Sequence, residues 1–151
     1  KAVEYLHRRV ALEDVVSAHL RAIDRAADIG FGRYIISATT PFTIEDAPLL
    51  RTDAPAVVSR RAPGWQAVFA ARGWVMPACL DRVYVNDLAR RQLGWTPAVD
   101  FGTILAEAAE GRPVQTPLSR LVGAKGYHPG GLVDGMYRTH PIGTAEVTNL
   151  S

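Results

Sequence analysis

A long amphipathic stretch between two short β-branched runs constrains most strongly what this chain can fold into. Residues 11–28, "ALEDVVSAHLRAIDRAAD", place apolar side chains at helical spacing on one face and charged side chains on another. The flanking runs "VEYLHRRV" (3–10) and "RYIISA" (33–38) have the composition of short strands. Gly30 and Gly32 stop the helix before the second run. The pattern predicts strand, helix, strand.

The periodicity also predicts which face of this helix is apolar. That face carries Leu12, Val15, Val16, His19, Leu20, Ile23 and Ala27. Glu13 and Asp14 fall in the first turn, where acidic side chains favour the positive end of a helix. Because His19 belongs to the apolar face, we expect a hydrogen-bonded core histidine there rather than a catalytic one.

Caps and prolines predict several shorter helices further along. Thr43 is expected to cap a helix that begins at Ile44. Prolines then divide the chain, and residues 54–61 and 64–72 are expected to be helical. "PLSRLVGA" is expected to add one more turn of helix, and the Gly- and Pro-rich residues 125–151 are expected to form an irregular tail.

The stretch "LDRVYVNDLARRQLGWTP" (80–97) predicts a third strand at 82–85, followed by a short helix. Gly94 and Pro97 are expected to end that helix, and Trp95 is expected to be buried. Asp100 is expected to cap the next helix. Strands that alternate with helices indicate an α/β or α+β class. Three short strands cannot form a well-covered sheet, so something else is expected to complete it.

Composition excludes several classes of protein. No window approaches 18 consecutive apolar residues, so we expect no membrane span. The formal net charge of +2 gives no argument for nucleic acid. The single Cys79 excludes an internal disulfide and fits a cytoplasmic protein, with the thiol expected to be a small buried group.

The common signatures of enzymes and metal sites are absent or weak. The segment "GAKGYHPGG" (123–131) follows no predicted strand and opens no helix, so it is a poor dinucleotide-binding loop. His128, Asp134 and His140 form only a weak candidate metal site. Arg8 and Arg9 sit between a predicted strand and a helix, where α/β proteins bind ligands. The structural interpretation, one surface arginine and one arginine in an ion pair, is the one that we favour for this pair.

Three segments in order resemble one enzyme family. They are "RRVALEDVVSAHLRAI" (8–23), "GRYIISATTPFTIED" (32–46) and "DLARRQLGWTPAVDF" (87–101). They resemble the carboxyl-terminal half of the extended short-chain dehydrogenases/reductases, the NAD(P)-dependent epimerase/dehydratase family typified by UDP-galactose 4-epimerase. The resemblance covers about residues 5–110.

The resemblance implies an α/β fold: the last strand or strands of a Rossmann-type sheet, followed by a small α/β substrate-binding domain. Residues 1–30 would end the nucleotide-binding fold, 31–122 would form the substrate-binding domain, and 123–151 would be the irregular tail. The family's cofactor-binding glycines and its Tyr-x-x-x-Lys lie in the amino-terminal half and have no counterpart here. This chain would therefore contain no catalytic residue and would bind no cofactor alone.

By position, the resemblance assigns substrate binding to Arg82 and Tyr84, with Arg8 or Arg9 as further contacts. The intact parent would be a cytoplasmic, homodimeric epimerase, dehydratase or reductase that uses NAD or NADP and acts on a nucleotide sugar or related sugar. Its partner would be the missing amino-terminal half, with no nucleic acid and no membrane involved. The alternative is a free-standing, non-enzymatic module that binds an anionic ligand or a partner protein through its arginines.

Overall fold

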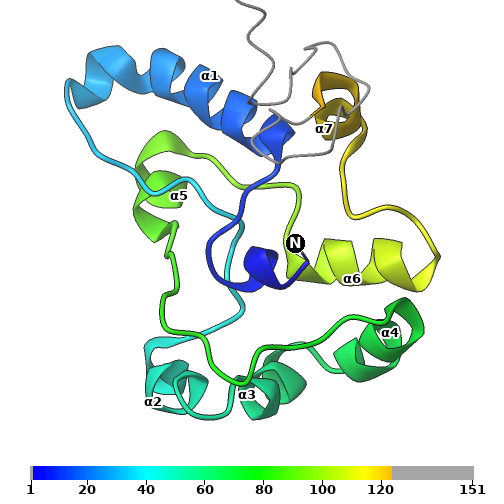
Figure 1. Ribbon diagram of the computed structural model, residues 1–151. Coiled ribbons are helices and arrows are strands. Elements are labelled where there is room, and N and C mark those ends of the chain that lie inside the picture. Colours follow the sequence, from blue (N-terminus) through cyan, green and yellow to red (C-terminus); the bar gives the residue numbers. More distant parts are fainter. Residues whose placement is uncertain (1, 124–151) are drawn as a thin grey trace, which may run out of the picture. The chain divides into compact units, whose positions relative to one another are not determined.

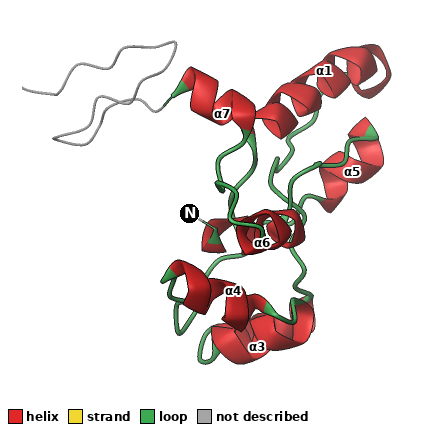
Figure 2. Ribbon diagram, turned by 90° about the vertical axis from the view of Figure 1, so that its right-hand side faces the viewer, coloured by secondary structure: helices red, strands yellow, loops and turns green. Residues whose placement is uncertain are grey.

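The computed structural model describes residues 2–123, which are helical wherever they form regular structure (Figures 1 and 2). Two compact units are present, Lys1–Val114 and Gln115–Ser151, and each is considered by itself. The first unit contains 3₁₀ helices η1 (Val3–Leu6) and η2 (Ile44–Asp46) and helices α1 (Leu12–Ile29), α2 (Ala47–Leu50), α3 (Ala54–Arg61), α4 (Trp65–Arg72), α5 (Asp87–Leu93) and α6 (Phe101–Ala109).

The predicted α/β class is wrong, and so is the Rossmann-type sheet that the resemblance implied, because residues 2–123 contain no strand. The first predicted strand begins as η1, whereas 33–38 and 82–85 are extended without a ladder. Single backbone bonds link them to the first segment, from Ala38 N–H to Arg9 O (2.7 Å) and from Tyr84 N–H to His7 O (2.7 Å). β-Branched side chains favour extended backbone locally, but a strand also needs a neighbour in register.

The locally coded helix ends are confirmed. Thr43 and Asp46 form a reciprocal capping box at η2, and the Asp100 carboxylate accepts the Thr103 N–H at the start of α6. Gly94 ends α5 with φ of 64°, a left-handed conformation that favours glycine. The predicted helices at 11–28, 54–61 and 64–72 correspond to α1, α3 and α4.

The larger core of the first unit centres on aromatic side chains from α4 and α6. Phe69 is buried and meets Trp65 and Trp74 edge to face, with ring centroids 5.1 and 5.4 Å apart. Phe101 closes the group from α6 at 6.3 Å. Edge-to-face pairs add to the energy of apolar burial, so this group ties α4 to α6.

A second, smaller cluster joins α1 to α5, which lie side by side at one end of the unit (Figure 1). Trp95 is 2% exposed, as predicted, and packs with Leu93 and Ala89 against Ala18 of α1. The Trp95 indole N–H donates to the Ser17 hydroxyl (2.9 Å). The Leu-Gly-Trp sequence is thus a structural clamp.

The expected inner face of α1 proves to be its outer face. Val16, Leu20 and Ile23 are 47%, 58% and 71% exposed, and His19 is also exposed. Ala18 and Asp14 are buried instead. At 100° per residue, Ala18 lies about 140–160° around the helix from Val16, Leu20 and Ile23. Periodicity located an apolar stripe correctly but could not say what, if anything, covers it.

The second unit contributes α7 (Pro117–Val122), the turn predicted for "PLSRLVGA". Thr116 caps it by accepting the Ser119 N–H. Across both units, no helix within residues 2–123 combines the length and apolar character that a membrane crossing requires. The domain boundaries at 30 and 122 and the cytoplasmic location remain predictions.

Candidate functional site

His7 anchors the segment that carries two of the predicted substrate-binding residues. Its Nδ1 lies 2.9 Å from the Arg82 carbonyl oxygen, and its own carbonyl accepts the Tyr84 N–H. A carbonyl can only accept, so the ring is the tautomer that carries a proton on Nδ1. Burial lowers the pKa of His7, partly opposed by the bond to Arg82, so the ring is neutral at pH 7.

Asn86 makes the corresponding connection to the segment that follows α1. Its buried side-chain amide donates to the Ser37 carbonyl (2.8 Å) and to the Thr39 hydroxyl (3.2 Å). The Thr40 hydroxyl donates in turn to the Leu6 carbonyl (2.8 Å). Side-chain bonds therefore hold together three extended segments whose own backbones form no ladder.

Arg82 and Tyr84 lie on this anchored segment. Arg82 is exposed and Tyr84 is half-buried. Within residues 2–123, neither the guanidinium nor the phenol has a hydrogen-bond or ion-pair partner. Because alternate side chains of an extended segment point the same way, both are available on one side of it.

Arg8 and Arg9 are placed differently, because both reach the same carboxylate. The Arg9 guanidinium lies 2.5 Å from Glu4 and also sits over the Tyr5 ring, 5.7 Å from its centroid. Arg8 is more exposed and lies 3.5 Å from Glu4. The pKa of Glu4 is lowered: burial would raise it, but its bond to Arg9 and the positive charges around it outweigh that. A ligand would have to compete with Glu4 for either arginine.

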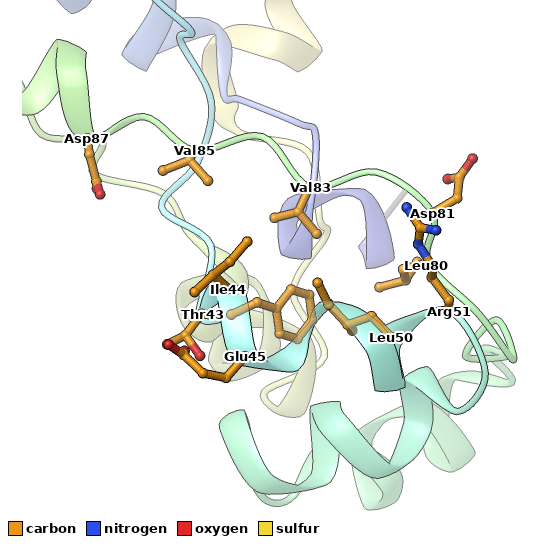
Figure 3. Close-up of a pocket in the computed structure, with 12 residues that line it drawn as sticks. Thr43, Ile44, Glu45, Leu50, Arg51, Leu80, Asp81, Val83, Val85 and Asp87 are labelled. Carbon is orange, nitrogen blue, oxygen red and sulfur yellow. The ribbon is translucent and has the colours of Figure 1, made fainter.

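The opposite side of the 81–87 segment forms one wall of a trough with a volume of about 610 Å³ (Figure 3). Val83 and Val85 project toward Ile44 and Leu50 on the other wall, while Asp87 lies at one end and Arg51 and Asp81 at the other. The remaining lining residues are Phe42, Thr43, Glu45, Ala47 and Leu80. This trough was not predicted from the sequence. A signal was present, because "DRVYVND" (81–87) alternates between an Asp-Val-Val-Asp set, which lines the trough, and an Arg-Tyr-Asn set, which does not.

Other predicted features carry no site. The expected burial of Cys79 is wrong, because its side chain is exposed. His19 is exposed, and its Nδ1 donates to the Val15 carbonyl oxygen of its own helix (2.8 Å). In the described part of the chain no three His, Cys, Asp or Glu side chains gather as metal ligands. His128, Asp134, His140 and most of "GAKGYHPGG" lie outside that part.

Within residues 2–123, no glycine-rich turn leads from an extended segment into a helix, as the turn of a dinucleotide-binding loop does. In this described part of the chain, the only positive-φ glycine at a helix start is Gly64, and it follows α3 through Ala62 and Pro63 rather than an extended segment. Comparison of the chain with protein-family models, curated proteins and solved structures found no match. The site must therefore be interpreted from its own residues.

Proposed function

We propose that this chain is the substrate-binding half of an NAD(P)-dependent epimerase, dehydratase or reductase that acts on a nucleotide sugar or a related sugar. The observation that carries the proposal is the Arg82–Tyr84 pair, whose polar groups have no partner within residues 2–123, on a segment anchored by His7. A guanidinium suits a phosphate, and a phenol suits a ribose hydroxyl or ring face. Arg82 forms no ion pair within residues 2–123, whereas Arg8 and Arg9 both pair with Glu4.

The proposal assigns different roles to the two halves of the intact enzyme. A cofactor would supply hydride transfer, and its binding residues and the general base would belong to the amino-terminal half. Arg82 would hold the diphosphate and Tyr84 the ribose, while His7 and Asn86 keep their segment fixed. The exposed stripe of Val16, Leu20 and Ile23 on α1 supports the existence of a further part, because solvent-facing apolar surface of this kind marks an interaction site.

The first test is binding of uridine diphosphate to the whole 151-residue chain, followed by NMR. Arg82→Gln should weaken binding roughly tenfold, since a charged hydrogen bond contributes about 1.5–3 kcal/mol and part of that is lost to solvent here. Tyr84→Phe should weaken it about two- to fivefold. The matched control is Arg21→Gln, which removes an exposed arginine of α1 that has no polar side-chain partner among the described residues. Equal affinity for Arg82→Gln and the unaltered chain would refute the assignment.

A further inference from the structure

The trough on the far side of the 81–87 segment has the size and lining of a small-molecule site. Its volume of about 610 Å³ lies inside the range of about 300–1,000 Å³ that is usual for ligand pockets. Buried Phe42, Leu50 and Leu80 give it an apolar floor, and Val85 and Ile44 are exposed at its rim. Water on this floor would be displaced favourably by an apolar body.

The charged groups of the trough are mostly acidic. Glu45, Asp81 and Asp87 carry three negative charges against one positive charge on Arg51, a formal sum of −2. A hydrogen bond with Thr43 lowers the pKa of Glu45, which is therefore ionised at neutral pH. Within residues 2–123, neither Asp81 nor Arg51 forms an ion pair.

The two kinds of charge are separated along the trough. Arg51 and Asp81 lie together at one end, so their charges offset each other for a ligand (Figure 3). Glu45 and Asp87 lie toward the other end. The nearby cation Arg61 does not line the trough: it donates to the Thr43 hydroxyl (2.9 Å) and is already paired with Asp46 (2.8 Å). Arg90 is 3.7 Å from Asp87, but both groups are largely exposed and a pair of this kind is weak. The Asp87 end thus favours a positive group.

We propose that the trough binds a small organic cation: an ammonium group at the Asp87 and Glu45 end, with an apolar body along Val83, Val85 and Leu50. An anion would meet a net negative lining, and a fully hydrated cation would leave the apolar floor unused. The site does not rest on the proposed function, because neither Arg82 nor Tyr84 lines the trough. It would be a second site on the same segment.

Three probes with one apolar body separate the contributions of charge and burial: hexylammonium, hexanol and hexanoate. Each is titrated into the whole chain, and the methyl signals of Val83 and Val85 are followed by NMR. We expect saturable shifts at both residues and the order hexylammonium, then hexanol, then hexanoate, with about two- to fivefold between ammonium and alcohol. No saturable shift, or hexanoate as the tightest binder, would overturn the proposal.

Variants then assign the effect to the trough. Asp87→Asn should reduce the preference for hexylammonium over hexanol about two- to fivefold and leave hexanol affinity unchanged. Val85→Ser should weaken binding of both probes, since it removes apolar surface that they cover. Asp28→Asn is the matched control, because it removes an exposed carboxylate of α1 that also pairs with an arginine. An equal effect of Asp28→Asn and Asp87→Asn would show a general charge effect and overturn the site.

Discussion

Asp14 offers the sharpest test of how the first unit is held together. Its buried carboxylate accepts the Ala98 N–H (2.7 Å) on one oxygen and the Val99 N–H (3.1 Å) on the other. Asp14→Asn keeps the volume but replaces one acceptor by an amide that can only donate. The variant loses the negative charge that strengthens these hydrogen bonds, and it leaves one of the two backbone N–H groups buried without an acceptor. We therefore expect the free energy of unfolding to fall by about 3 kcal/mol.

The measurement is urea unfolding at pH 7, followed by tryptophan fluorescence, since Trp95 lies in the cluster that this contact closes. In a unit of this size 3 kcal/mol corresponds to a fall in Tm of roughly 10–15 °C. Asp24→Asn is the control, because Asp24 is exposed on the same helix, and it should change stability by less than about 0.5 kcal/mol. A loss below about 1 kcal/mol for Asp14→Asn would refute the view that Asp14 fixes the 95–99 loop.

Two further predictions concern pH and charge. Because the pKa of His7 is lowered in the folded chain, the unfolded chain binds a proton first as pH falls below 6.5. The free energy of unfolding should therefore decrease there by up to about 1.4 kcal/mol per pH unit. His7→Asn keeps a donor near the Nδ1 position and should remove this slope, and an unchanged slope would contradict the role of His7. The hydrogen bond from Arg61 lowers the pKa of Asp46 below 3.8. Asp46→Asn should therefore reduce the free energy of unfolding in urea by about 1–2 kcal/mol at pH 7, and by progressively less as pH falls below 3.8. A reduction that does not depend on pH would contradict a stabilising ion pair.

Local signals in the sequence carried most of the correct predictions. Gly94 can adopt positive φ, Asp100 can accept a backbone N–H at a helix start, and Trp95 is too large and apolar to leave exposed. Each statement depends on a few neighbouring residues. The corresponding predictions of helix ends and of the buried tryptophan were confirmed.

The errors came from contacts between distant segments. The β-branched residues of "RYIISA" favour extended backbone, but whether they form a strand depends on a partner that the local sequence does not encode. Asp14 was assigned to the helix dipole, yet it binds backbone groups more than eighty positions away in the chain. Leu20 and Ile23 marked an apolar stripe without showing whether anything covers it.

The candidate site was found in part. Arg82 and Tyr84 were singled out by resemblance and position, and the structure adds that their polar groups are free within residues 2–123. The trough on the other side of the same segment escaped notice because its second wall comes from residues 42–51, about forty positions earlier. The hydrogen bond from His7 to the Arg82 carbonyl was also not predicted, because the two residues are 75 positions apart in the chain.

The most direct test of the proposed function is to read the coding sequence immediately upstream of Lys1 and assay its product together with this chain. We expect a glycine-rich loop between a strand and a helix, a Tyr-x-x-x-Lys motif, and NAD(P)-linked turnover of a nucleotide sugar that falls when Arg82 is replaced by Gln. An upstream sequence with neither motif would contradict the proposed function. Turnover that is unaffected by Arg82→Gln would leave the enzyme class standing and refute the assigned substrate contact.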